Sequence, residues 1–99
     1  MNKIGTMSEI EFMSIFGDNL RDLIDEVGIG QRELAKEIGV THSTINYYIH
    51  KKRMPSLPVF INLCIALDCN PDDLVPMYDY IRWIRVFENA KPTGAFYFS

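Results

Sequence analysis

QRELAKEIGVTHSTINYYIHKKR, residues 31–53, holds two short apolar patterns of helical period with a turn between them. The first pattern predicts a helix over 31–38 whose buried stripe consists of Leu34, Ala35 and Ile38. Gly39 readily adopts the left-handed conformation in which many helices end. Thr41 is a suitable N-cap for the second helix, whose apolar side consists of Ile45, Tyr48 and Ile49. Two helices joined by so short a turn predict a helix-turn-helix.

The opposite face of the second helix is polar and suits no apolar core, because it consists of His42, Ser43, Asn46, Tyr47 and His50. Residues 31–54 contain five basic and two acidic side chains, a net charge of +3, although the whole chain has a formal net charge of -3. Residues 1–30 have a net charge of -4 and residues 55–99 a net charge of -2. The positive charge is therefore a local property of this segment.

Size and composition indicate a single domain with a modest core, since the chain has 99 residues of which 47% are apolar. The first residues contain no apolar stretch of signal-peptide length, and no later run reaches the roughly 18 residues of a membrane span. We therefore expect a cytosolic protein that does not enter a membrane. Cys64 and Cys69 lack metal-type spacing, which favours buried thiols over a disulfide or a pair of metal ligands.

A long first helix is predicted over about residues 9–27. Its apolar side chains recur at steps of three and four residues: Met13, Phe16, Leu20, Leu23, Ile24 and Val27. Ser8 and Glu11 fit a capping box at its start, and Gly28 can end it in the left-handed conformation.

Two further helices follow the helix-turn-helix. Ser56 can cap a helix of about eleven residues with Pro58 in its first turn, and the inward stripe of this helix consists of Phe60, Leu63, Cys64 and Leu67. Asn70 and Pro71 can start a fifth, short helix that Pro76 limits. Since no segment before the tail alternates as a strand does, the predicted fold class is all-α, with five helices and short connections.

Residues 12–76 resemble the helix-turn-helix domain of the Cro and phage-repressor family. The resemblance rests on features in the right order and spacing: Gln31 at the start of a helix, Leu34-Ala35, the turn 38–41, buried Ile45, Arg53-x-Pro55, Leu67 and Asp72-Asp73-Leu74. It implies a compact five-helix, lambda-repressor-like DNA-binding domain over residues 1–76. Such domains usually bind operator DNA as dimers.

The polar face of the helix 42–50 is the predicted reader of the major groove, where each base pair has a distinct pattern of donors and acceptors. The candidates for base contacts are His42, Ser43, Asn46 and Tyr47. Asn46 suits bidentate pairing with adenine, whereas Tyr47 has an alternative role at a phosphate or a sugar. The candidates for phosphate contacts that the resemblance implies are Gln31, Thr41, Lys51, Lys52 and Arg53.

Two positions depart from the family pattern. Family members often have glutamate where this chain has Ile49, and glycine near Lys51. If Lys51 takes a left-handed conformation, the cost relative to glycine is about 1–2 kcal/mol. The alternative is that the loop follows another path.

Residues 77–99 form an extension beyond the resembling region, with a predicted helix over 77–88. Charged side chains recur at steps of three residues and leave a wide apolar surface around the rest of that helix. The surface either packs on its own domain or meets the same element of a second subunit. We predict a homodimer in which the contact residues are Tyr78, Ile81, Trp83, Ile84 and Phe87. For the last residues, where Pro92 and Gly94 disfavour a helix, an added strand and disorder both stay open.

The sequence thus predicts a transcriptional regulator that binds specific double-stranded DNA, most simply a dimeric bacterial or phage repressor. No nucleophile with its base, phosphate-binding glycine loop or metal cluster is evident, so we expect neither an enzyme nor a cofactor. One alternative is an antitoxin or restriction-modification controller that binds its own operator and a small partner protein. The other, which the net acidity suggests, is a protein-interaction module that uses this fold without binding DNA.

Overall fold

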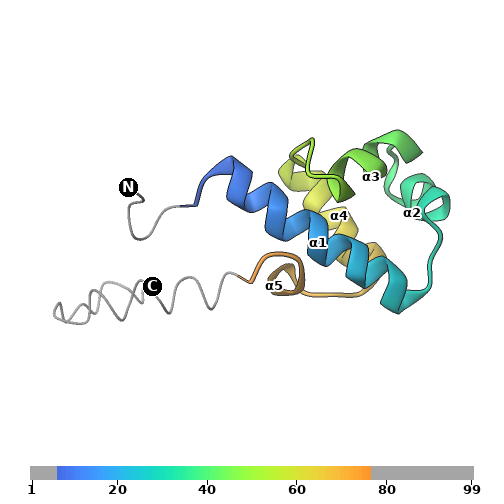
Figure 1. Ribbon diagram of the computed structural model, residues 1–99. Helices are drawn as coiled ribbons and strands as arrows, with labels where there is room; N and C mark the ends of the chain where they lie inside the picture. Colours follow the sequence, from blue (N-terminus) through green and yellow to red (C-terminus); the bar gives the residue numbers. More distant parts are fainter. Residues whose placement is uncertain (1–6, 77–99) are drawn as a thin grey trace, which may run out of the picture.

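The computed structural model describes residues 7–76, which contain five α-helices and the segments that connect them (Figure 1). The helices are α1 (Glu9–Val27), α2 (Gln31–Ile38), α3 (His42–Ile49), α4 (Leu57–Leu67) and α5 (Pro71–Leu74). These residues contain no strand, and the predicted all-α fold class is confirmed. The predicted helix 77–88 and the tail after it lie outside the described residues.

The long helix α1 begins and ends as its sequence predicts. At its start, the Glu11 amide donates to the Ser8 hydroxyl over 3.1 Å, and the Ser8 amide donates to a Glu11 carboxylate oxygen over 2.9 Å. This reciprocal pair satisfies two amides that the helix itself leaves without acceptors. At its end, Gly28 has a φ of 81° and donates its amide to the Ile24 carbonyl.

The shorter helices are delimited by the same local chemistry. Gly39, at a φ of 79°, ends α2, and the Thr41 hydroxyl caps α3 by accepting from the Thr44 amide over 3.1 Å. The Ser56 hydroxyl accepts from the Val59 amide over 3.3 Å at the start of α4. Side-chain oxygens at these starts take the place of the missing carbonyls of a preceding turn.

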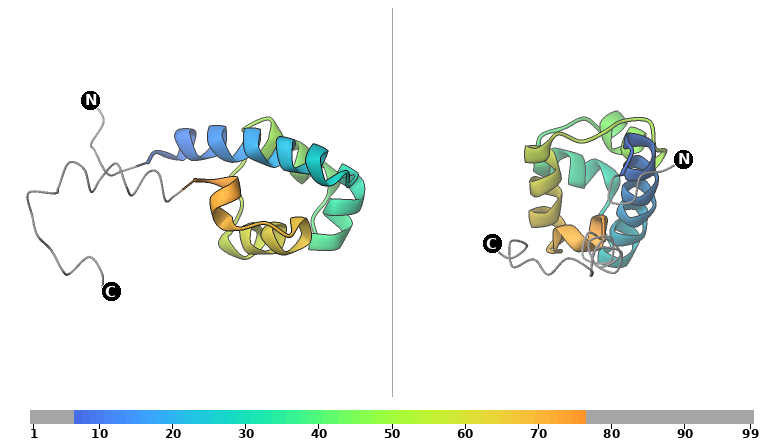
Figure 2. Two further views of the ribbon diagram at one scale, coloured as in Figure 1. Left: turned by 90° about the horizontal axis from the view of Figure 1, so that it is seen from below. Right: turned by 90° about the vertical axis from the view of Figure 1, so that its left-hand side faces the viewer.

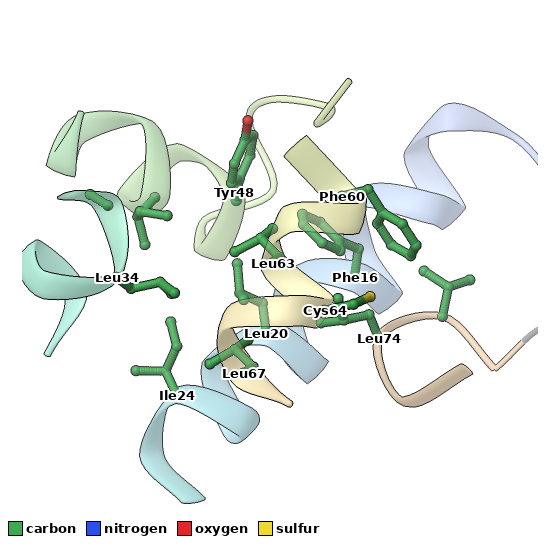
Figure 3. Close-up of a cluster of buried hydrophobic side chains, with 13 residues drawn as sticks. Phe16, Leu20, Ile24, Leu34, Tyr48, Phe60, Leu63, Cys64, Leu67 and Leu74 are labelled. Atoms are coloured by element: carbon green, nitrogen blue, oxygen red, sulfur yellow. The ribbon is translucent and has the colours of Figure 1, made fainter. Parts of the chain in front are cut away.

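The hydrophobic core lies between α1 on one side and α4 with α5 on the other, and α2 and α3 close one end of it (Figure 2). Phe16 is fully buried at the centre of the core. The centroid of its ring lies 5.6 Å from that of Phe12, 5.6 Å from that of Tyr48 and 5.9 Å from that of Phe60. The Tyr48 hydroxyl points away from this cluster (Figure 3). Aromatic and aliphatic burial of this kind is the main source of stability in a domain of this size.

Two positions in α1 differ from the predicted apolar pattern. Val27 continues the pattern in sequence, but its side chain is 49% exposed, because it lies in the last turn of the helix. Phe12 was not part of the pattern, yet it packs on Phe16 and Phe60. Helical period identifies a face, but the partner elements decide how far along that face the core extends.

Both cysteines are free thiols: Cys64 is buried, as predicted, whereas Cys69 is only half-buried. Burial raises the pKa of both thiols, and the pKa of Cys69 reaches about 12. Within residues 7–76, no helix is both long and apolar enough to cross a membrane. No group of His, Cys, Asp and Glu in the same range has the arrangement of a metal site.

Candidate nucleic-acid interface

The helix α3 presents the polar face that the sequence predicts. Ile45 and Tyr48 are buried against the core, so Ser43, Asn46 and Tyr47 are exposed to solvent. His42 is half-buried at the first position of the helix. The candidates for base contacts therefore lie on one accessible helical face, as a reader of the major groove requires.

His50 belongs to the end of α3. Its amide donates to the Asn46 carbonyl over 3.0 Å, and its ring Nδ1 lies 2.9 Å from the same oxygen. The imidazole is thus turned back onto the helix, where it helps to satisfy a terminal carbonyl.

A left-handed residue ends α3, and that residue is Lys51, with a φ of 64°. The Lys52 amide donates to the Tyr47 carbonyl over 2.8 Å, and the Lys51 amide donates to the Tyr48 carbonyl over 3.1 Å. These two bonds form a Schellman motif, in which the left-handed position is most often glycine. Of the two paths left open by the sequence, the chain takes the strained one.

The side chain of Lys51 is directed onto α1. Its ammonium Nζ lies 2.9 Å from a carboxylate oxygen of Asp18, and both side chains are nearly half exposed. The hydrogen bond from Lys51 holds the pKa of the Asp18 carboxyl below its usual value of 3.8, and the charges of Lys51 and Arg21 act in the same direction against a desolvation effect. Lys51 is therefore already paired in the free protein.

Gly17 brings α1 and the end of α3 into backbone contact. A Cβ atom at this position would lie 2.7 Å from the Tyr48 carbonyl oxygen and 3.1 Å from that of Ile49. It would also lie 3.1 Å from Cγ of Lys51. Since real Cβ contacts essentially never fall below 3.0 Å, only glycine fits here without a shift of the backbone.

Tyr47 and Arg53 form a second local pair. The guanidinium carbon of Arg53 lies 5.1 Å from the centroid of the Tyr47 ring, which is the geometry of a cation–π contact. The structure thus brings a candidate base contact and a candidate phosphate contact together. The sequence predicts separate roles for these two residues.

The start of α2 offers amides to an anion. Gly30 precedes the helix and has no side chain to cap it, whereas α1, α3 and α4 are each capped by a hydroxyl. Gln31 is half-buried at the first position of α2. The Thr41 hydroxyl, by contrast, is already engaged within the fold. It accepts from the Thr44 amide, and its oxygen lies 2.9 Å from the hydroxyl oxygen of Thr44.

Four cations on α2 and the segment after α3 are free of ion pairs in the part of the chain that is described: Arg32, Lys36, Lys52 and Arg53. Lys51 is the exception among the five basic residues of 31–54. Asp18 and Gly17 were not among the site residues predicted from the sequence. An isolated glycine inside a helical pattern was the one available signal, and it pointed to close packing.

The family model for helix-turn-helix domains, HTH_3, matches residues 20–74. The chain belongs to this helix-turn-helix family. It is a DNA-binding regulator of the Cro type, with the five-helix fold described above. Its matched region contains α2, α3 and the cationic segment after α3.

Two solved structures resemble this helix-turn-helix domain. The restriction-modification controller protein C.AhdI from Aeromonas hydrophila is 32% identical, with a TM-score of 0.60 over 63% of this chain and 94% of that chain. The SOS-response transcriptional repressor LexA from Eubacterium rectale is 29% identical, with a TM-score of 0.63 over 70% of this chain and 73% of that chain. No curated protein matches the sequence.

Proposed function

We propose that the protein is a repressor that binds a specific DNA operator through the exposed face of α3. The observation that carries this proposal is the accessible row of Ser43, Asn46 and Tyr47 on a short helix beside a net positive segment. His42, at the first position, joins them as a candidate base contact. An amide side chain such as Asn46 can make two hydrogen bonds to adenine, and such a contact discriminates by about 1–3 kcal/mol against the wrong base.

The phosphate contacts are proposed for residues around that face. Lys52 and Arg53 are not in ion pairs among the described residues, and the uncapped start of α2 with Gln31 suits an anion because of its amides and the helix dipole. Thr41 can approach a phosphate only while it also caps α3. Lys51 differs from all of these because its ammonium is already paired with Asp18.

A homodimer is part of the same proposal, since two recognition helices related by a two-fold axis can read half-sites about one DNA turn apart. The predicted contact helix 77–88 lies outside the described residues. The described residues add one supporting feature: α4 exposes three aliphatic side chains at four-residue spacing, Leu57, Ile61 and Ile65. No charged residue occurs within α4.

The test is a selection of bound sequences from random duplex DNA, performed with the wild-type protein and with an Asn46→Ala, Tyr47→Ala double variant. Both side chains are exposed, so the variant should keep the fold. We expect an enriched inverted repeat with the wild type and loss of that enrichment with the variant. A folded wild-type protein that enriches no sequence at low salt would favour a protein-interaction module instead.

A second candidate is a restriction-modification controller with a small protein partner. It is favoured by the 32% identity to C.AhdI, a controller of which 94% is covered. Under this candidate the chain still binds DNA and is still not an enzyme. Purification of the chain from its native cells, with a second small protein retained at a fixed ratio, would support it. A chain that elutes alone would favour the simple repressor.

A further inference from the structure

Lys51 occupies a backbone position that suits glycine. Among residues 7–76, only Lys51 and Asp68 have a positive φ without being glycine. Aspartate tolerates this conformation because its short side chain can bond locally, but lysine has no such advantage. A favourable interaction of the lysine side chain would offset this backbone cost.

The side chain finds that interaction on α1. The aliphatic stem of Lys51 lies against Gly17, where the missing Cβ leaves room for it, and the ammonium reaches Asp18 at 2.9 Å. Gly17 also lets the last carbonyls of α3 approach α1. Two consecutive residues of α1, Gly17 and Asp18, thus contact the end of the recognition helix and Lys51, the second residue after it.

We propose that Lys51 is a positioning residue, which fastens the end of α3 to α1 through Asp18, and that this pairing withholds its ammonium from the DNA backbone. The proposal rests on the proposed function, since it concerns the same DNA-binding surface. It assigns the phosphate contacts after α3 to Lys52 and Arg53, and it gives Asp18 a role in setting DNA affinity although Asp18 need not touch DNA.

Salt dependence of DNA binding distinguishes a phosphate contact from a positioning role. Log affinity falls as log salt concentration rises, and each cation that neutralises a phosphate releases a counterion and adds about 0.9 to the magnitude of this slope. Slopes are compared below by their magnitude. A positioning residue changes the affinity by the same factor at every salt concentration and leaves the slope unchanged.

The first experiment compares Lys51→Gly with Lys52→Ala in binding to one duplex that the wild type has selected. Glycine suits the left-handed backbone, so the Lys51→Gly variant should fold. We expect it to bind more weakly than the wild type with a parallel salt line, whereas the slope of Lys52→Ala should fall by about 0.9. An equal fall of slope in Lys51→Gly would overturn the proposal, and so would an unchanged affinity together with an unchanged slope.

The second experiment releases the lysine. In Asp18→Asn the ammonium loses its partner, and we expect the salt slope to steepen by about 0.9 as Lys51 gains a phosphate contact. The double variant Asp18→Asn, Lys51→Gly should return to the wild-type slope. A steeper slope that persists in the double variant, or an unchanged slope in Asp18→Asn, would contradict the withheld charge.

A measurement without DNA separates this proposal from the proposed function. The Asp18 carboxyl can be titrated by NMR in the free protein, and its pKa should rise toward the ordinary value in Lys51→Gly. If the pKa of Asp18 is the same in Lys51→Gly as in the wild type, the ion pair on which the proposal depends does not form in solution. If the pair is present but the wild type binds no duplex, the proposed function fails, and the proposed withholding of Lys51 from DNA fails with it.

Discussion

At position 17, a single hydrogen atom in place of a side chain determines how closely two helices approach. Gly17 lies in the middle of α1, where glycine is intrinsically less favourable than alanine by about 1 kcal/mol. The close carbonyls of Tyr48 and Ile49 explain its presence, because they leave no room for a Cβ. The packing benefit therefore outweighs the local preference.

We expect Gly17→Ala to destabilise the protein by about 1–3 kcal/mol, because overpacking against backbone atoms exceeds the gain in helix propensity. Urea unfolding followed by circular dichroism would measure the change. Gly30→Ser is the matched control, because a Cβ added at Gly30 would have no other atom within 4 Å. Serine is also a favourable N-cap, so the free energy of unfolding should stay the same or rise slightly. Equal losses in both variants would contradict the close-contact argument.

Asp18 should make stability depend on pH in the acidic range. Its pKa in the folded protein is lowered below 3.8 by Lys51, so its ionised form stabilises the fold at higher pH. This contribution is complete above the unfolded pKa and is lost as the pH falls through the folded pKa. We expect wild type to be more stable than Asp18→Asn at pH 6, with the difference disappearing at low pH. Thermal unfolding across that range would show a constant difference if the pair contributed nothing.

At the scale of helices, the sequence predicts the boundaries well because the determinants are local. At several helix ends the boundary is determined by a capping residue within about four residues of it: Ser8 with Glu11, Gly39, Thr41 and Ser56. The same locality explains why the exposed face of α3 was predictable. Once Ile45 and Tyr48 are assigned to the core, the helical period places the polar side chains of α3 on the opposite, exposed face.

Long-range pairings in the site were not predictable in the same way. Asp18 and Lys51 meet only because α1 and α3 pack together. A single amino-acid sequence contains no periodic pattern that links two positions so far apart. The left-handed Lys51 illustrates the limit, since the sequence left two loop paths open. The Tyr47–Arg53 contact also depends on the path that the chain takes after α3.

The cap of α3 can be tested by Thr41→Ala. Loss of the hydroxyl leaves the Thr44 amide without its acceptor, so we expect a loss of about 1 kcal/mol in the free energy of unfolding. Thr41→Ser keeps the capping oxygen and should lose much less. Chemical denaturation of both variants checks this, and equal stability of Thr41→Ala and wild type would exclude a capping role.

At the scale of the whole molecule, α4 differs from the other long helices by being apolar on nearly every side. Its inner face packs in the core, and Leu57, Ile61 and Ile65 remain outside, the last of them 71% exposed. Apolar surface at regular helical spacing is typical of an interface. Ile61 lies at the middle of this stripe, so an antiparallel second copy would place aliphatic residues opposite aliphatic residues.

We expect Ile61→Asp to shift the protein from dimer to monomer in sedimentation equilibrium while its circular dichroism stays unchanged. A carboxylate at the centre of an apolar contact would be desolvated without a partner. Ile10→Asp is the control, because Ile10 is also exposed but lies in the first turn of α1, where an acid is favourable. A dimer that survives Ile61→Asp would place the contact elsewhere, and a monomeric wild type would end the dimer proposal.

Three consecutive residues of α1 contact two separate parts of the molecule. Gly17 receives the end of α3, Asp18 binds Lys51, and the Asn19 side chain donates to the Leu74 carbonyl of α5 over 2.9 Å. In mechanical terms, α1 is the common support to which α3 and α5 are both attached at neighbouring points. A pulling force on the chain beyond Pro76 would therefore act on α1 at Asn19, one residue from the Asp18–Lys51 contact that holds the end of α3.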